Sequence, residues 1–361
     1  MKIAYIAETS ITNKSAYTLH VLKMCDALSK NNDLILMIPS SKNQTCNVKI
    51  KRIFLLSTRK NFKIKSILGF KANNFIYRTI FAIKTAHKLK NKNINLILTR
   101  SILTSFFLSF FKIQHLLEIH SEMGGLTKIL MINLNFINSK YIKKIIFISK
   151  SLRRIFNIES KKKIIILHDA VDTKNFPQKK KTNKIRNLTY AGSFHEGKGV
   201  ELIIKLANKF SKLRFNLYGD PLNKNYYVTK NVKIHGHINY NKVPSKLLDS
   251  DILLLPSSKI QYGRSKNINI SNYNSPLKLF EYLAAGRVIV SSKRDGISEI
   301  LKHNYNSIFV SGFEVKDWEK AIHNVINNKY NLNKIRMNSL KTAEKFTWEN
   351  RAKMIINSNH D

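Results

Sequence analysis

The segment Ser275–Gly286, SPLKLFEYLAAG, constrains the fold more than any other part of this chain. Its apolar side chains recur at helical spacing on nearly all sides, which predicts a helix that is buried almost all round. Ser275 is the expected N-cap, Pro276 the expected first helical residue and Gly286 the expected end. The next residues, RVIVSS at 287–292, read as a buried strand, so both elements belong inside an α/β domain.

Two charged residues do not fit a purely structural helix at this place. Lys278 puts a positive charge into the first turn, where the helix dipole favours a negative one. Glu281 puts a carboxylate on a mostly apolar helix, where desolvation is costly without a partner. An anion at the helix start and a hydroxylated group beside Glu281 would satisfy both, and a nucleotide sugar offers both groups in its phosphates and its ribose. The alternative is a surface ion pair between the two residues.

The rest of the chain alternates short apolar runs with amphipathic segments, a pattern typical of parallel doubly wound sheets. In the first half the expected strands are Lys2–Ala7, Leu34–Ile38, Ile94–Thr99, His115–Ile119, Ile145–Ile148 and Ile164–Leu167. In the second half a glycine-rich turn, Gly192–Gly199, joins a strand at Leu188–Ala191 to a helix. Glycines at such a junction let backbone amides approach phosphate, and Lys198 would neutralise its charge.

In their order and spacing these motifs resemble the retaining glycosyltransferases of family 4, which have the GT-B fold. The shared segments are YAGSFHEGKG, the strand ending in YGD, the HGHI turn, DILLLPSS, SPLKLFEYLAAG and the closing FTWENRA. The resemblance implies an α/β protein of GT-B type, with two doubly wound Rossmann-like domains facing across a cleft. The expected parts are an N-terminal acceptor-binding domain at 1–171, a charged linker at 172–186, a C-terminal nucleotide-sugar-binding domain at 187–345 and a helix at 346–361 that crosses back to the first domain.

The resemblance also implies which residues form the site. The implied donor-binding residues are Gly192, Ser193, Lys198, Gly219, Ile238, Ser275, Pro276, Leu277, Lys278 and Glu281. The implied catalytic residues are His120, Lys198 and Glu281, with His120 facing the transferred sugar. Two positions depart from the family pattern: Ser193 stands where an arginine is usual, and Tyr273 stands where many members have the first of two glutamates.

His120 follows its expected strand at the carboxyl edge, where doubly wound sheets bind ligands. A single histidine at such a place is often a structural residue with satisfied hydrogen bonds, and that interpretation stays open. Glu118 points to the same side because side chains alternate along a strand. We expect an ion-pairing role for Glu118 and regard it as a weaker second candidate for the site.

The chain is strongly basic, with a formal net charge of +41. The stretch Leu34–Leu117 contains 16 lysines or arginines and no acidic residue. Such a field favours phospholipid headgroups, phosphorylated glycolipids or nucleic acid, although a compositional bias towards lysine is the competing explanation. The lysines expected on its exposed face are Lys60, Lys63, Lys65, Lys71, Lys88, Lys90 and Lys92, near the apolar Phe62, Ile67, Leu68 and Phe70.

We therefore expect an enzyme that moves a sugar from a nucleotide sugar to a glycan or lipid-linked acceptor, in cell-surface polysaccharide or lipopolysaccharide-type assembly. Lysines and helix-terminal amides would stabilise the leaving nucleoside diphosphate, so neither a metal nor a cofactor is expected. The alternatives are a sugar-nucleotide epimerase on the same fold, or a basic protein that binds nucleic acid or membrane without catalysis. No nucleic-acid partner is expected, because no nucleic-acid-binding module is recognisable.

Two further features bear on where the protein acts. The first ten residues read as a strand rather than as a signal peptide. The longest apolar run, Ile102–Phe111, is too short to span a bilayer. We expect a cytoplasmic protein, in peripheral contact with an anionic membrane surface.

Overall fold

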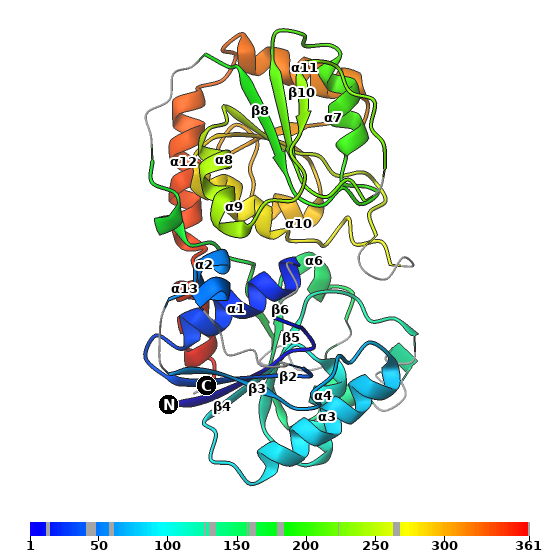
Figure 1. Cartoon of the computed structure of the whole chain (residues 1–361), viewed down its shortest axis with the longest axis vertical. Helices are drawn as coiled ribbons and strands as arrows, with labels where there is room; N and C mark the ends of the chain where they lie inside the picture. Colours follow the sequence, from blue (N-terminus) through cyan, green and yellow to red (C-terminus); the bar gives the residue numbers. More distant parts are fainter. Residues whose placement is uncertain are drawn as a thin grey trace. The chain divides into compact units, whose positions relative to one another are not determined.

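The computed structural model describes residues 1–11, 15–40, 48–57, 61–125, 128–129, 135–156, 158, 164–178, 184–222, 224–262 and 268–359. The chain forms two compact units, here called the first unit and the second unit. The first unit comprises residues 1–168 and 348–361, and the second unit comprises residues 169–347. Figure 1 shows that each unit is an α/β structure with helices packed on a sheet.

The first unit is built on a seven-stranded sheet in the order β3-β2-β1-β4-β5-β6-β7. Every strand pair in it is parallel. Its strands are β1 (Lys2–Ile6), β2 (Asp33–Ile38), β3 (Phe62–Ser66), β4 (Leu96–Thr99), β5 (His115–Ile119), β6 (Ile142–Phe147) and β7 (Ile164–Ile166). Its helices are α1 (Ala16–Leu28), α2 (Val48–Phe54), α3 (Phe75–Lys90), α4 (Ile102–Phe110), η1 (Phe136–Asn138), α6 (Lys150–Arg153) and α13 (Trp348–Asn357).

Alternation along β1 assigns its side chains to the two faces of this sheet. Ala4 and Ile6 join the apolar core beneath α3 and α4, together with Phe81 and Leu108. Tyr5 points to the other face, where its hydroxyl donates to the Glu118 carboxylate of β5. Helices α1 and α13 pack against each other in the same unit. The C-terminal helix is therefore part of the first unit.

The second unit is built on a six-stranded parallel sheet in the order β10-β9-β8-β11-β12-β13. Its strands are β8 (Asn187–Ala191), β9 (Arg214–Tyr218), β10 (Val232–Ile234), β11 (Ile252–Leu255), β12 (Val288–Ser292) and β13 (Ile308–Val310). Its helices are η3 (Thr173–Asn175), α7 (Val200–Ala207), η4 (Tyr240–Lys242), α8 (Val243–Leu248), α9 (Leu277–Ala285), α10 (Asp295–Ser298), α11 (Val315–Ile326) and α12 (Leu332–Lys345).

The two faces of this second sheet carry separate apolar clusters. One contains Leu188 and Leu254 with side chains of α7 and α11. The other contains Ala191 and Leu253 with side chains of α8, α9 and α12. Burial on both faces is the reason that β11, ILLL, reads as a continuous apolar run. The expected fold class, two parallel-sheet α/β domains, is confirmed.

Strand β3 was not expected from the sequence. It pairs with β2 at the edge of the first sheet, and Lys63 and Lys65 project to solvent from it. Phe62 and Ile67 are buried, which corrects their assignment to the exposed apolar surface. An edge strand needs only one apolar face, so lysines at alternate positions masked the strand signal. Lys60 lies outside the described residues.

One helix start also differs from expectation. Helix α9 begins at Leu277, and its N-cap is Pro276 in an extended conformation rather than Ser275. Proline has no side-chain acceptor, so this helix start has no side-chain cap.

Residues 172–178 pack on the second unit, although the sequence assigned them to a linker. Phe176 is buried in an apolar cluster of that unit, and Gln178 donates to the carbonyl of Ala284 at 2.9 Å. Among the described residues no helix is both long and apolar enough to cross a membrane.

Candidate functional site

The second unit carries a pocket where its strand order reverses. Strand β8 continues to β9 on one side, while β11 lies on its other side, so the connections after β8 and β11 leave in opposite directions. Ligands of doubly wound sheets bind at the carboxyl ends of the strands at such a point. A small open pocket lies here. Its lining residues are Lys198, Leu255, Pro256, Ser257, Gln261, Ser271, Asn274, Pro276, Lys278 and Ile297.

Lys278 is the most unusual residue of this pocket. Its Nζ is buried and has no hydrogen-bond partner among the described residues. It lies 3.9 Å from the centroid of the Tyr190 ring. Burial lowers the pKa of Lys278 well below its ordinary value, the nearby charge of Lys198 lowers it further, and Glu281 opposes the shift. A buried ammonium without an acceptor is a strong indication of a missing anion.

Lys198 lines the same pocket from the turn before α7. Burial lowers the pKa of Lys198 to about 8. The structure therefore brings together the two lysines that the sequence singled out, 80 positions apart in the chain. Two amines that repel each other in one pocket provide positive charge for a single multivalent anion.

Gly192 and Gly219 allow the chain to approach closely beside Lys278. A Cβ atom at Gly192 would lie 2.9 Å from the Lys278 Nζ. A Cβ atom at Gly219 would lie 2.0 Å from the Gly192 carbonyl oxygen. Larger residues at either position would displace the turn, so these glycines serve close packing around the lysine.

Glu281 is buried on α9 and is paired with Tyr240. The Tyr240 hydroxyl donates a hydrogen bond to this carboxylate, and burial together with the Glu281 charge raises the pKa of Tyr240 well above its usual range. A surface ion pair does not explain Lys278 and Glu281, because the Lys278 Nζ and the Glu281 side chain are both buried.

The remaining donor-site residues lie around this core in different ways. The Ser275 hydroxyl is buried without a hydrogen-bond partner among the described residues. Pro276 lines the pocket, and Leu277 begins α9. Ser193 is exposed, and its carbonyl accepts a hydrogen bond from the Tyr190 hydroxyl at 2.7 Å. Ile238 packs at the edge of an apolar cluster.

Gln261 is a pocket residue that the sequence did not reveal. It is 3% exposed, and the Ser257 hydroxyl donates to its Oε1 at 3.0 Å. Its Nε2 has no hydrogen-bond partner in the described part of the chain. The contact with Ser257 fixes the amide orientation, so the buried N–H groups remain for a ligand. A glutamine in a polar loop carries no sequence signal of this kind.

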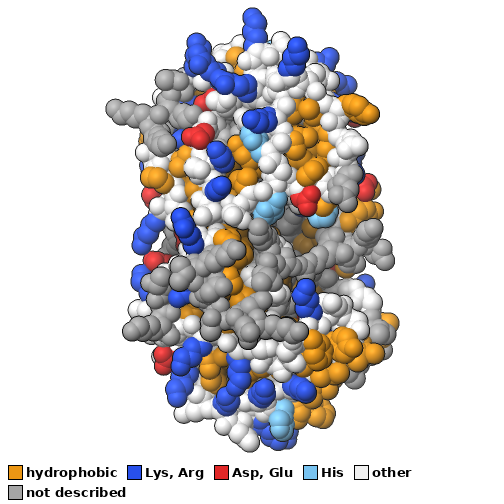
Figure 2. Space-filling view, in the orientation of Figure 1, with side chains coloured by type: hydrophobic (Ala, Val, Ile, Leu, Met, Phe, Trp, Pro, Cys, Tyr) orange, Lys and Arg blue, Asp and Glu red, His pale blue; other side chains and the backbone are white. Residues whose placement is uncertain are grey.

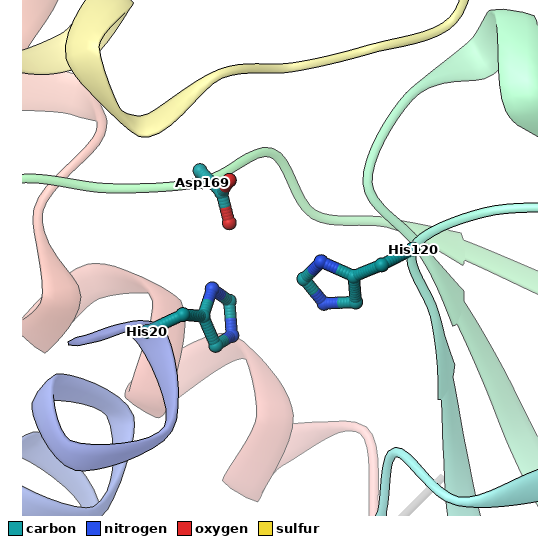
Figure 3. A group of neighbouring side chains, drawn as sticks. All are labelled: His20, His120 and Asp169. Atoms are coloured by element: carbon teal, nitrogen blue, oxygen red, sulfur yellow. The ribbon is translucent and has the colours of Figure 1, made fainter. Parts of the chain in front are cut away.

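His120 lies in the first unit, directly after β5. Its Nε2 hydrogen bonds to Glu118 Oε1 at 2.5 Å, and its ring meets the His20 ring edge-on at a centroid distance of 4.7 Å. Figure 3 shows the two imidazoles side by side; Asp169, also drawn there, is the first residue of the second unit. His120 is therefore a partly exposed histidine that is hydrogen-bonded to a buried carboxylate.

Glu118 is the centre of this cluster. Arg351 of α13 places Nη2 2.8 Å from Glu118 Oε1, and His20 places Nε2 3.0 Å from the same oxygen. The expected ion-pairing role of Glu118 is thus observed. Arg351 and His20 were missed because each is one polar residue in an ordinary helical pattern. The order of the sequence gives no sign that they meet Glu118.

Comparison with known proteins agrees with this arrangement. Residues 171–345 match the sequence profile named glycosyl transferases group 1. An uncharacterized glycosyltransferase of Methanocaldococcus jannaschii is 27% identical over 233 residues, covering 61% of this chain and 52% of that protein. The chain thus spans about half the length of this curated relative.

Solved structures share the fold over the whole chain. A glycosyltransferase from Rickettsia africae superposes with a TM-score of 0.74 at 13% identity, covering 99% of this chain and 97% of that one. HepE of Anabaena, in complex with UDP and glucose, gives a TM-score of 0.74 at 12% identity and covers 100% of both chains. The lipopolysaccharide outer core galactosyltransferase WaaB gives 0.68 at 14% identity, with 99% of both chains covered. The chain has the GT-B fold of these proteins.

Proposed function

We propose that the protein is a glycosyltransferase that takes its sugar from a nucleotide sugar bound in the pocket of the second unit. The observation that carries this proposal is the buried, unpartnered Nζ of Lys278 in a pocket that Lys198 also lines. The diphosphate of a nucleotide sugar supplies the charge that these lysines lack. Helix α9 begins beside them without a side-chain cap, so its first amides are available to the same anion.

Glu281 provides the second half of the donor site. One of its carboxylate oxygens accepts the Tyr240 hydroxyl, and a carboxylate has acceptor capacity for more than one donor. We assign the remaining capacity to the ribose hydroxyls of the nucleotide. The Gln261 amide is assigned to a phosphate or sugar oxygen, because only its N–H groups are left for a ligand.

The chemistry proposed is departure of the nucleoside diphosphate, stabilised by Lys198 and Lys278. Fixed positive charge at the place where negative charge develops lowers the barrier without reorganisation. The two lysines would fill the role that a divalent metal has in other transferases, so we propose a reaction without metal or cofactor. His120 would face the transferred sugar, and retention of configuration follows from the family 4 resemblance.

For the acceptor we propose a glycan or a lipid-linked sugar, in cell-surface polysaccharide or lipopolysaccharide-type assembly. Two proteins of the same fold support this proposal: WaaB is a lipopolysaccharide outer core galactosyltransferase, and WaaG is a glycosyltransferase involved in lipopolysaccharide biosynthesis. Acceptors of this kind are membrane-borne. The first unit offers a surface that fits such a location.

That surface lies on α3 and α4 and is here called the α3–α4 face. Ile76 and Ile83 are 66% and 39% exposed, and they lie on one stripe of α3 because they are seven residues apart. Phe110 at the end of α4 is 70% exposed. Figure 2 shows hydrophobic side chains gathered over this part of the first unit, with lysines and arginines beside them.

Basic side chains are crowded at the same unit. The charge of Lys92 lowers the pKa of Lys65, and burial and Lys88 add to the shift, so these three ammonium groups lie close to one another. Apolar side chains beside cations are typical of proteins that lie on an anionic membrane. We therefore propose that the α3–α4 face contacts an anionic lipid surface and that the protein works in the cytoplasm, next to the membrane.

The proposed donor site is tested by calorimetric titration of UDP, GDP and ADP into the wild-type chain and Lys278→Met. We expect one nucleotide to bind the wild type and to lose at least tenfold in affinity in the variant. Lys205→Met is the matched control, because Lys205 is exposed on α7 of the same unit. Equal affinity in Lys278→Met would show that the anion binds elsewhere.

A further inference from the structure

In the first unit, nitrogen atoms of three side chains lie close to one oxygen of a buried carboxylate. Glu118 Oε1 lies 2.8 Å from Arg351 Nη2, 2.5 Å from His120 Nε2 and 3.0 Å from His20 Nε2. The other oxygen, Oε2, accepts the Tyr5 hydroxyl at 3.2 Å. These contacts come from β5, α13, α1 and β1, so the cluster is assembled from four elements.

Charge balance at Glu118 favours a neutral His120. The Arg351 guanidinium is always charged and compensates the single negative charge of Glu118. A proton on His120 would add a second positive charge beside that guanidinium at a buried site. Burial, with the charge of Arg100 second, lowers the pKa of His120 to about 3, against the opposing pull of Glu118. His120 is accordingly neutral at physiological pH.

A neutral imidazole has one N–H and one lone pair. Burial alone would raise the pKa of Glu118, but Arg351 and the neighbouring imidazoles hold it well below its usual range, so this group is an ionised acceptor. The nitrogen of His120 that faces it must therefore be the donor. That nitrogen is Nε2, which leaves Nδ1 with the lone pair.

We propose that Glu118 and Arg351 are positioning residues that hold His120 as a neutral imidazole protonated on Nε2, so that Nδ1 is a hydrogen-bond acceptor. Such a group accepts from a sugar hydroxyl and does not deliver a proton as a general acid. The inference rests on the proposed function only for the hydroxyl that meets Nδ1. The tautomer itself is a property of the free protein.

Within the first unit, the groups that bear on the His120 ring are few. Glu118 and His20 contact it directly, and Arg100 acts through its charge. Tyr5 and Arg351 act through Glu118. Trp348 packs against His20 at 5.0 Å between ring centroids, so α13 also fixes the second imidazole. Helix α13 would thus be a functional support of the site rather than only a packing element.

The direct test is the nitrogen spectrum of the wild-type chain labelled with ¹⁵N in histidine, with His120 assigned by comparison with His120→Gln. We expect a pyrrole-type signal for Nε2 and a pyridine-type signal for Nδ1, both unchanged from about pH 8 to about pH 5.5. The opposite tautomer, or protonation of both nitrogens within that range, would overturn the proposal. No nucleotide sugar is needed, so this outcome is independent of whether the proposed transfer reaction is found.

Variants of Arg351 distinguish positioning from a merely structural ion pair. In Arg351→Met the Glu118 carboxylate loses its fixed countercharge, so the His120 imidazole should take up a proton at about pH 6. Arg351→Lys keeps the charge and should restore the neutral His120 signal. Nucleotide-sugar hydrolysis by Arg351→Met should acquire an acid limb that the wild type and Arg351→Lys lack.

The matched control is Lys30→Met. Lys30 forms an ion pair at 3.1 Å with Glu349, which lies on α13 as Arg351 does. This pair is on the exposed surface and away from Glu118. This variant should leave the His120 spectrum and the pH profile unchanged. A neutral, Nε2-protonated His120 in folded Arg351→Met would refute the role of Arg351, and if that variant does not fold, the wild-type spectrum still decides the tautomer.

Discussion

The ammonium nitrogen of Lys278 lies 3.9 Å from the centroid of the Tyr190 ring. Tyr190 is fixed in turn, because its hydroxyl donates to the Ser193 carbonyl in the glycine-rich turn. A desolvated cation over an aromatic face is stabilised by about 2 kcal/mol. Removal of an ammonium from water costs several times as much. The pocket is therefore electrostatically incomplete until an anion enters it.

The first prediction separates stability from function at this position. Lys278→Met removes a buried charge without a partner, so the melting temperature should stay the same or rise, while turnover of the nucleotide sugar falls at least tenfold. Thermal unfolding and hydrolysis assays on the same samples measure both. A large fall in melting temperature would mean that Lys278 supports the fold instead.

The second prediction concerns pH. Burial lowers the pKa of Lys198 to about 8, whereas an amine paired with diphosphate keeps its proton to a higher pH. Binding therefore takes up a proton around that pH. Nucleotide affinity should be full below about pH 8 and should fall by up to about tenfold per unit above it. Lys198→Arg, whose guanidinium stays charged, should show a weaker dependence over the same range, and a flat wild-type profile would contradict the assignment.

The third prediction divides the work between the two units. His120→Ala should lose transfer rate yet bind nucleoside diphosphate about normally, since His120 belongs to the first unit. Lys198→Ala should lose nucleotide binding itself. Calorimetry on both variants measures the difference. Loss of nucleotide binding in His120→Ala would show that the histidine belongs to the nucleotide site.

The fourth prediction concerns the membrane. The chain should bind anionic vesicles and not neutral ones, and raised salt should weaken binding, because each engaged lysine contributes about 1 kcal/mol at low salt. Lys63/Lys65→Glu should weaken it as well, and Ile76→Glu on the α3–α4 face should weaken it at every salt concentration. Lys205→Glu in the second unit is the control. Equal, negligible sedimentation with both vesicle types would contradict the proposal.

Several parts of the fold were readable from local pattern. Strand β5 coincides with the expected strand His115–Ile119, and all of its residues are buried. Gly286 ends α9 with a φ of 60°, as its place after a helical run predicted. Strand β3 was hidden by its alternating lysines, and Pro276 displaced Ser275 as the N-cap of α9. Such differences occur at sheet edges and helix ends, where tertiary contacts rather than the local sequence determine the structure.

Residues of the site could be predicted from the sequence only where a residue differs in polarity from its neighbours. Lys278 and Glu281 do so on an apolar helix, and the sequence therefore pointed to both. Arg351 does not, because its partner Glu118 lies 233 positions away and only the fold brings them together. Gln261 is similar, since its meaning comes from an amide nitrogen that is buried and left without a partner in the described structure.

The central claim is that the pocket of the second unit binds and activates a nucleotide sugar. The most direct measurement is release of nucleoside diphosphate from a panel of nucleotide sugars by the wild type, Lys278→Ala and Glu281→Gln. The account predicts slow hydrolysis of at least one donor by the wild type. It also predicts a loss of at least about tenfold in each variant with an unchanged circular dichroism spectrum, which is about 1.4 kcal/mol of transition-state stabilisation. Near-normal turnover in both variants would contradict it.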